Sequence, residues 1–248
     1  MSESVPVPVP GRASYHPLDN PVLAGLTGPH AHFAERRGRV LAYHAEVSPW
    51  LALPDDPDAG DWADAVHLVG DDGTAVLAGT EVELPAGWEV TFQVDGVQLV
   101  DESVDAVPDD EAVVLGAADV PEMLDLVERT RPGPFRPRTI ELGTYLGIRR
   151  EGELVAMAGE RMRPPGWREI SAVCTAPEYR GQGLGARLVL AVAAGIKARG
   201  ETPFLQAAGD NEGAIRLYEA LGFRLRRRMP FVGIRVPEPS RVPAGAGG

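Results

Sequence analysis

The arrangement of hydrophobic and polar positions changes about halfway along the chain. In the first hundred residues, short runs rich in β-branched and aromatic residues are typical of strands. These runs are RVLAYHAEV, DAVHLVG, TAVLAGTEV and WEVTFQVDGVQLV. Turn-forming stretches such as PDDPDAG and GDDGT separate them. The pattern therefore predicts a β-rich first half.

The second half mixes strands with helices. DVPEMLDLVERT has Asp119 at the N-cap position and helical apolar spacing. TYLGIRREGELVAMAGERM predicts a hairpin that turns at Glu151-Gly152, and WREISAVCT predicts a third strand. A helix over Gly183–Arg199, the strand PFLQAA, the helix NEGAIRLYEALG and a final strand around FRLRRRMPFVGIRV follow. This order indicates the α+β class.

Four segments follow from these changes in pattern. The first 20 residues alternate Val with Pro, and the last 13 are rich in Pro and Gly, so neither end predicts packed structure. We therefore predict an extended arm over 1–20, an acidic β-rich domain over 21–108, an α+β domain over 109–235 and a flexible tail over 236–248.

Composition excludes several classes of protein. The 248 residues are 44% hydrophobic, as in soluble globular proteins, and no apolar run reaches the roughly 18 residues of a membrane span. The first residues have no apolar core of a signal peptide, and Cys174 has no second cysteine to pair with. We expect a cytoplasmic protein that is not associated with membranes.

Charge is distributed unevenly. Residues 1–108 carry four arginines against eighteen acidic residues, a net charge of −14, whereas residues 109–248 carry +2. The overall charge of −12 argues against nucleic-acid binding, and the run Arg226–Arg228 on a strand is expected to be solvated or paired. A polyphosphate ligand would prefer the second half. The five histidines show no metal-ligand spacing, so no metal site is predicted.

One loop carries a specific signal. Arg180-Gly181-Gln182-Gly183-Leu184-Gly185-Ala186 joins a predicted strand to a predicted helix. Glycines allow close backbone approach, and the free amides of a helix N-terminus bind phosphate. The glycines also fit a dinucleotide fingerprint, but APEYR separates them from the strand and only 63 residues follow Gly185.

The same residues resemble a known superfamily. VCTAPEYRGQGLGARL is similar to the pyrophosphate-binding motif Arg/Gln-x-x-Gly-x-Gly/Ala of the GNAT acetyltransferases, with Arg180, Gly183 and Gly185 at its fixed positions. A second segment, NEGAIRLYEALGF, resembles a downstream motif of the superfamily. Its matching positions are Asn211, Ala214, Tyr218, Gly222 and Phe223. The resemblance covers residues 112–235 and leaves out the first hundred.

This resemblance implies a GNAT fold, with a mixed sheet splayed at its centre and acetyl-CoA held in the splay. The pyrophosphate would lie on the amides of Gly181–Ala186, and the pantetheine arm would pair with Val173 and Thr175. Asn211 would bind the arm from the other side. The first domain is interpreted as a degenerate relative of the same fold.

Acetyl transfer to an amine needs a base, an oxyanion donor and an acid. The second half has no histidine, so Glu169 is the predicted base, with Glu160 in reserve. Strand alternation would place Glu169 on one face with Val173. Tyr218 matches the tyrosine acid of the superfamily. Cys174 is interpreted as a buried thiol whose amide, or that of Val173, stabilises the oxyanion.

The resulting prediction is an N-acetyltransferase that moves acetyl from acetyl-CoA to a primary amine in a ternary complex. A non-catalytic CoA-binding module and a dinucleotide-dependent oxidoreductase remain as alternatives. The acceptor is a small molecule or a peptide, RTRPGPFRPRT (Arg129–Thr139) is its expected contact region, and the acidic first domain would favour a cationic acceptor. A homodimer is left open.

Overall fold

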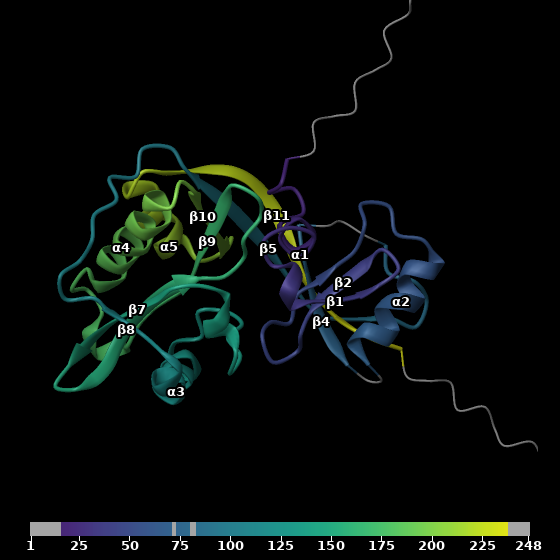
Figure 1. The fold of residues 1–248 in the computed structure, drawn as a ribbon, viewed down its shortest axis with the longest axis horizontal. Coiled ribbons are helices and arrows are strands. Elements are labelled where there is room, and N and C mark those ends of the chain that lie inside the picture. The colour runs from purple at the N-terminus through teal and green to yellow at the C-terminus, as the bar shows by residue number, and fades with distance from the viewer. Residues whose placement is uncertain (1–15, 71–72, 80–82, 238–248) are drawn as a thin grey trace, which may run out of the picture.

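The structure is a computed structural model that describes residues 16–70, 73–79 and 83–237. Figure 1 shows two lobes, a larger one built around β7–β10 and a smaller one around β1–β4. The helices are α1 (Pro21–Leu26), α2 (Ala59–Val69), α3 (Val120–Thr130), α4 (Leu184–Ala198), α5 (Glu212–Ala220) and the 3₁₀ turns η1 (Ala31–Phe33), η2 (Ala117–Asp119), η3 (Thr139–Leu142) and η4 (Pro177–Tyr179).

The strands of the small sheet are β1 (Ala34–Arg37), β2 (Val40–Tyr43) and β3 (Leu51–Ala52). Those of the large sheet are β4 (Thr74–Ala78), β5 (Glu89–Asp101), β6 (Val113–Val114), β7 (Tyr145–Arg150), β8 (Glu153–Glu160), β9 (Trp167–Thr175), β10 (Thr202–Ala208) and β11 (Phe223–Arg235). The predicted arm and tail lie mostly in 1–15 and 238–248, outside the described residues.

The large sheet has eight strands in the order β4-β11-β5-β10-β9-β8-β7-β6. Strands β9 and β10 run parallel, and the other neighbouring strands are antiparallel. This mixed sheet confirms the predicted α+β class. It is not the parallel, doubly wound sheet that binds dinucleotides.

Helices cover both faces of the sheet. Residues of α4 and α5, including Leu188, Val192 and Tyr218, form a buried cluster with Ile148 and Ile170 of the sheet. On the other face, Met123 and Leu126 of α3 pack with Met157, Cys174 and Tyr145. Among the described residues, no helix is both long enough and apolar enough to cross a bilayer.

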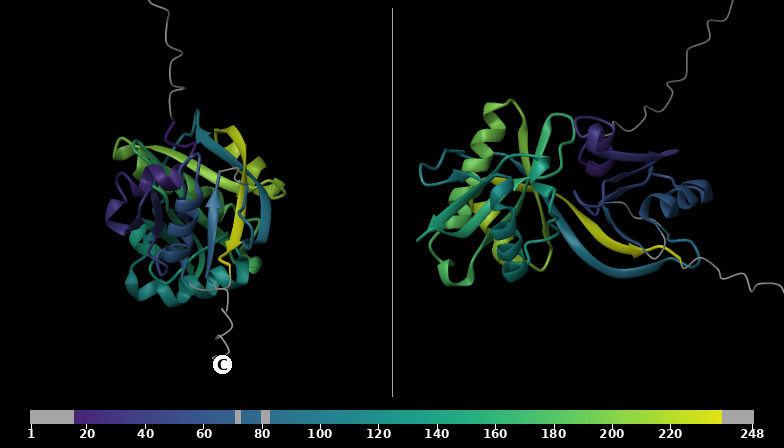
Figure 2. Two further views of the ribbon diagram at one scale, coloured as in Figure 1. Left: turned by 90° about the vertical axis from the view of Figure 1, so that its right-hand side faces the viewer. Right: turned by 60° about the horizontal axis from the view of Figure 1, so that its bottom comes forward.

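A long two-stranded ribbon joins the lobes. Strands β5 and β11 pair along almost their whole lengths, and Figure 2 shows them curving from the large lobe to the small one. β5 also pairs with β10, although its residues belong to the predicted first domain. The predicted boundary at residue 108 is therefore misplaced, because Glu89–Asp101 completes the large sheet.

Two arginines of the ribbon form ion pairs with the start of the described chain. Arg226 Nη2 lies 2.5 Å from Asp19 Oδ1, and Arg227 Nη1 lies 3.6 Å from the same oxygen. Arg226 also donates to the Gln98 side chain at 2.8 Å. The arginine run is thus paired in part, as the sequence predicts.

The small lobe contains one clear error of the sequence prediction. DAVHLVG is helical and not extended, because it continues α2. Asp58 caps this helix, accepting from the amides of Gly60 and Asp61, while the Asp61 carboxylate accepts from the Asp58 amide. The capping box fixes a helix start that the β-branched content of the run hides.

Candidate functional site

Strands β9 and β10 part in the middle of the large sheet. Their pairing ends at Ile170 and Leu205, yet β9 continues to Thr175 and β10 to Ala208. Ala172 has a φ of +53°, and the register with β8 shifts at the same place. A bulge bends a strand and ends its pairing. It therefore opens one backbone edge of β9 toward β10.

The alternation of backbone groups after the bulge shows which residues face that edge. The Ala176 amide donates to the Val155 carbonyl at 2.8 Å, and Cys174 is in register with Met157 of β8. Successive residues of a strand point their N–H and C=O groups to opposite sides. Val173 and Thr175 therefore face the open edge, whereas the Cys174 amide faces β8 and is badly placed as an oxyanion donor.

The glycine loop follows η4 and ends in the first turn of α4. Gly181 and Gly183 have φ values of +78° and +75°, which favour glycine. Gly183 occupies the N-cap position with no side-chain cap, and no acidic side chain lies in the first turn. The amides there have no acceptor inside the helix, so they suit an anion.

The other predicted residues of the loop surround these amides. Arg180 and Gln182 are exposed, and Arg180 Nε donates to the Thr175 carbonyl at 3.3 Å. Leu184 instead buries its side chain in the core, so it can offer only its amide. A Cβ on Gly185 would make ordinary contact with Thr175 and Val173, the strand residues of the open edge.

A cleft of about 410 Å³ lies beside the parted strands, between the two lobes. The small lobe and the ribbon contribute Trp50, Val76, Phe92, Val94 and Phe231 to its walls. The large lobe contributes Arg131–Pro134, Arg161, Val173, Gln206–Ala208, Asn211, Ala214 and Tyr218. Three predicted site residues, Val173, Asn211 and Tyr218, thus line one cleft. So does part of the predicted acceptor loop.

Tyr218 lies on α5 with 7% of its surface exposed. Burial raises the pKa of its phenol to about 12. A phenol with this pKa stays protonated at neutral pH, so it is available as a proton donor. Asn211 begins the same helix, and its side-chain oxygen accepts from the Ala214 amide at 3.1 Å.

Glu169 is not placed as predicted. Ile170 and Val173 pack on the cluster of α4 and α5, whereas Ala172 and Cys174 pack on that of α3. The bulge therefore reverses the alternation, and Glu169 does not share a face with Val173. Its carboxylate is fully buried and accepts from Arg161 Nε at 2.9 Å and Arg161 Nη2 at 2.8 Å.

Glu160 and Cys174 are likewise held in the interior. Glu160 is 2% exposed and pairs with Arg168 at 3.0 Å and Arg199 at 2.5 Å. Burial raises the pKa of the Cys174 thiol to about 11. A thiol with this pKa is a poor nucleophile at neutral pH, which suits the predicted structural role.

Sequence reasoning missed Trp50 and Arg161. Trp50 comes from the loop before β3, far from the glycine loop in the sequence, and Arg161 directly follows β8. The Arg161 guanidinium carbon lies 5.2 Å from the centre of the Trp50 ring. No motif marks either residue, because only the docking of the lobes brings them together.

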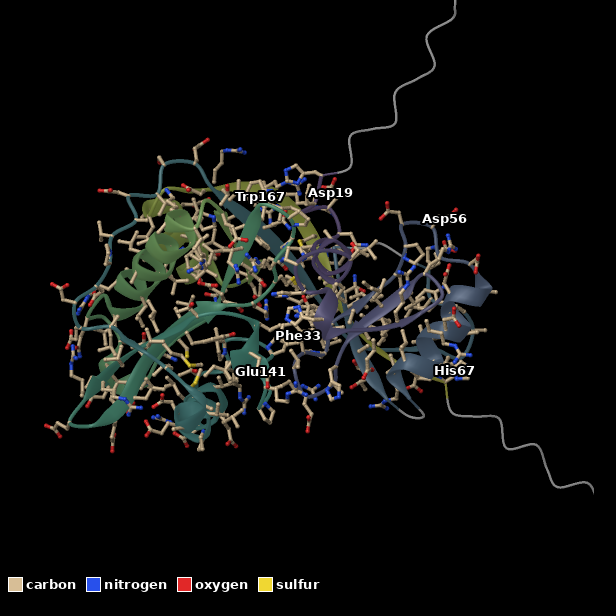
Figure 3. All side chains as sticks on the ribbon, in the orientation of Figure 1. Asp19, Phe33, Asp56, His67, Glu141 and Trp167 are labelled. Carbon is tan, nitrogen blue, oxygen red and sulfur yellow. The ribbon has the colours of Figure 1, made fainter. Side chains whose placement is uncertain are left out.

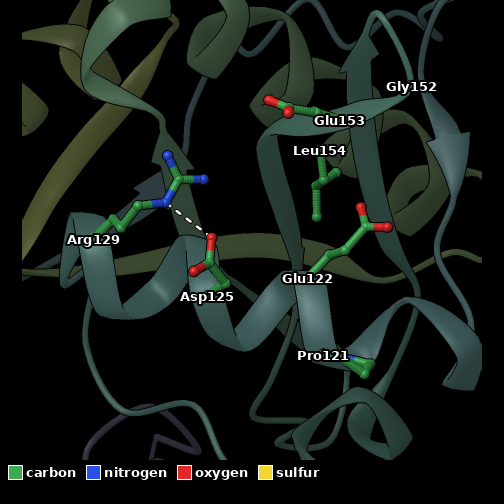
Figure 4. A pocket seen from close by; sticks show the side chains of 7 residues that line it. All are labelled: Pro121, Glu122, Asp125, Arg129, Gly152, Glu153 and Leu154. Atoms are coloured by element: carbon green, nitrogen blue, oxygen red, sulfur yellow. Dashed lines mark hydrogen bonds and ion pairs between the residues drawn. The ribbon is translucent and has the colours of Figure 1, made fainter.

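A second hollow, of about 590 Å³, lies between α3 and the β7–β8 turn. Figure 4 shows its lining, in which Arg129 of α3 is paired with Asp125 of the same helix at 2.9 Å. None of its residues belongs to the glycine loop, the open strand edge or α5. We therefore place the candidate site in the smaller cleft.

Across the described ranges, no group of three or more His, Cys, Asp or Glu residues could hold a metal ion.

Comparisons with known proteins agree with this geometry. A family model described as FR47-like protein matches residues 145–232. The N-alpha-acetyltransferase RimI of Mycobacterium tuberculosis is 38% identical over 90 residues, 34% of this chain and 56% of that protein. An uncharacterised protein of Mycobacterium leprae is 32% identical over 208 residues, 71% of this chain and 56% of its own. The alignments thus span about half the length of these curated relatives.

One solved structure matches most of the chain. It is a protein of Novosphingobium aromaticivorans assigned to the GNAT family of acetyltransferases. It is 42% identical, with a TM-score of 0.82, and the match covers 89% of this chain and 98% of the other. Such coverage extends well into the small lobe. By this similarity, and by the parted strands and glycine loop that accompany it, the chain belongs to the GNAT family.

Proposed function

We propose that this chain transfers the acetyl group of acetyl-CoA to a primary amine by direct attack in a ternary complex. The parted strands carry the proposal, because they put an open backbone edge, a helix N-terminus and a buried phenol around one cleft. The match to a GNAT acetyltransferase and the similarity to RimI support it.

Residues of the chain would hold the donor along three features. The amides from Gly181 to Ala186 and the Arg180 guanidinium would bind the pyrophosphate. The carbonyl of Val173 and the backbone of Thr175 would pair with the pantetheine amides as an added strand would. The side-chain amide nitrogen of Asn211 would donate to the arm from α5. These residues fit the donor. The first-turn amides of α4 have no acceptor inside the helix, and a Cβ at Gly181 or Gly183 would meet open space.

The thioester supplies an activated acetyl group. The amine nitrogen forms a bond to its carbonyl carbon, and the carbon–sulfur bond breaks. The leaving thiolate takes the proton of the Tyr218 hydroxyl, which is then restored from solvent. The Val173 amide, at the open edge, is the proposed oxyanion donor.

For the base, our proposal differs from the sequence-based prediction of Glu169. Both oxygens of Glu169 are engaged by Arg161, and its side chain lies on the face away from Val173. We therefore propose that a water molecule in the cleft takes the amine proton and that Glu169 positions Arg161.

The proposed function is tested by following free thiol with acetyl-CoA and a panel of primary amines. Release of CoA thiol that depends on an amine, together with an acetylated product by mass spectrometry, is the expected result. Arg180→Ala should raise the KM for acetyl-CoA about tenfold, because one charge-assisted contact to the pyrophosphate is lost. Binding of CoA without turnover of any amine would instead favour a binding module.

A further inference from the structure

Two residues that line the cleft have buried polar atoms with no hydrogen-bond partner among the described residues. Trp50 is 3% exposed, and its indole Nε1–H has no hydrogen-bond acceptor among the described residues. The side-chain oxygen of Gln206 is also buried without a donor there. Leaving such a group without a partner is unfavourable, and native proteins normally satisfy it. Both residues line the cleft, so a bound molecule could satisfy them.

Arg161 adds a cation beside the Trp50 indole. Its Nε and Nη2 bond the Glu169 carboxylate, and the Met162 amide donates to Glu169 as well, at 3.2 Å. Both oxygens of Glu169 thus accept hydrogen bonds. The Nη1 group of Arg161 has no hydrogen bond to any described residue, although the side chain lines the cleft. The ion pair therefore fixes a guanidinium with one edge left for a ligand.

The charge of the cleft differs from that of the domain around it. Arg131 and Arg161 line it, and no carboxylate does among the described residues. The acidic residues of the small lobe lie elsewhere: Figure 3 shows Asp56 on the part of that lobe remote from the large lobe. The expectation of a cationic acceptor, drawn from the net charge of the first domain, is therefore not supported by the lining.

We propose that the acceptor is a small amine that carries a carboxylate and an apolar side chain, as an aromatic amino acid does. The carboxylate would accept from Arg161 Nη1 and from the Trp50 indole N–H. The amine would donate to the Gln206 oxygen, and the apolar side chain would pack on Phe92 and Phe231. This inference rests on the proposed function and adds its substrate class.

Matched acceptors test the class directly. L-Phenylalanine and 2-phenylethylamine share the amine and the ring and differ in the carboxylate. We expect kcat/KM to be at least about 100-fold higher for L-phenylalanine. Without the carboxylate, the polar groups that would bind it are left without a partner. L-Phenylalaninamide should resemble 2-phenylethylamine. Equal or better turnover of 2-phenylethylamine would overturn the proposal.

Variants locate the selectivity in the cleft. The double change Arg161→Met with Glu169→Met replaces a buried ion pair by apolar side chains of similar size, which proteins often tolerate. It should bring the ratio of kcat/KM for L-phenylalanine to that for 2-phenylethylamine to within about fivefold of unity. Trp50→Phe keeps a ring, removes the N–H, and should lower the preference about tenfold. Should the double variant not fold, Trp50→Phe still decides.

A control and a binding measurement separate the two proposals. Trp62→Phe changes a buried tryptophan that packs on Trp88 outside the cleft, and it should leave the preference unchanged. Calorimetry with 3-phenylpropanoate, which has the carboxylate but no amine, should show binding to the wild-type protein with CoA and none to the double variant. Binding without acetylation of any amine would refute the transferase and keep the carboxylate site. Acetylation without carboxylate preference would refute the site alone.

Discussion

At the scale of single residues, the proposed proton transfer from Tyr218 is the first step to test. Tyr218→Phe should lower kcat about 100-fold, the smaller end of what a positioned acid contributes, with CoA affinity unchanged. Because the pKa of Tyr218 is raised to about 12, its ionisation should not reduce kcat anywhere between about pH 6 and pH 10. Steady-state rates and CoA titration provide the measurement.

Tyr145 offers a matched control for this change. It is fully buried on the other face of the sheet, and its hydroxyl has no partner among the described residues. Tyr145→Phe should leave kcat unchanged and keep or raise the free energy of unfolding, by up to about 1 kcal/mol. If Tyr145→Phe slows the reaction as much as Tyr218→Phe does, the phenol of Tyr218 has no special role.

Glu169 separates a base from a positioning residue. Glu169→Gln leaves Arg161 buried without its counter-charge, so the free energy of unfolding should fall by about 3 kcal/mol. The KM for the acceptor should rise at least tenfold while kcat for 2-phenylethylamine changes less than about threefold. Urea unfolding and steady-state kinetics measure both effects. A kcat that collapses at unchanged KM would restore Glu169 as the base.

At the scale of elements, the proposed binding of the donor depends on the start of α4. Gly183 caps the helix in the left-handed region, where an alanine costs about 1 kcal/mol or more. Gly183→Ala should therefore destabilise the fold modestly and raise the Kd for CoA about tenfold, since the loop amides would shift. Isothermal calorimetry with CoA measures the affinity.

A second glycine of the same helix provides the contrast. Gly195 lies in the interior of α4, where a Cβ would make only ordinary contact with Arg199. Gly195→Ala should raise the free energy of unfolding by about 0.5–1 kcal/mol through helix propensity. CoA affinity should not change. Equal loss of CoA affinity in both variants would mean that the helix as a whole, and not its first turn, controls binding.

At the scale of the whole molecule, His30 makes stability depend on pH. It is 2% exposed, and its Nδ1 lies 2.9 Å from the Tyr43 hydroxyl. Burial, and then the charge of Arg168 in the large lobe, lowers the pKa of His30 to about 3. The unfolded chain binds a proton below about pH 6.5, whereas the folded chain does not until about pH 3. Stability should therefore fall as the pH decreases through this window.

The expected loss between pH 7 and pH 4 from this one group is roughly 3 kcal/mol. Urea unfolding at several pH values measures it. His30→Gln should remove most of this slope, while His67→Gln, an exposed change on α2 of the same lobe, should keep it. A slope that is the same in His30→Gln and in the wild-type protein would assign the pH dependence to the carboxylates.

Local patterns determined much of this protein. The hairpin at Glu151-Gly152, the strand before the glycine loop and the helices α3 to α5 follow from alternation, turn residues and helical spacing, which act over a few neighbours. The glycine loop before α4 is equally local, because a glycine with positive φ and a helix start need no distant partner. The sequence alone therefore determined the elements of the second half and the form of this loop.

Only the tertiary structure decided what the cleft contains. The sequence predicted a first domain that ends at residue 108, but the pairing of Glu89–Asp101 with β10 and β11 depends on contacts more than a hundred residues apart. A single residue in the left-handed region, Ala172, puts Val173 and Glu169 on opposite faces of β9. No spacing rule reveals such a bulge. The meeting of Trp50 with Arg161 follows from the docking of two lobes. Long-range pairing, backbone irregularity and lobe packing are set by the whole fold, so they could not be predicted from local sequence.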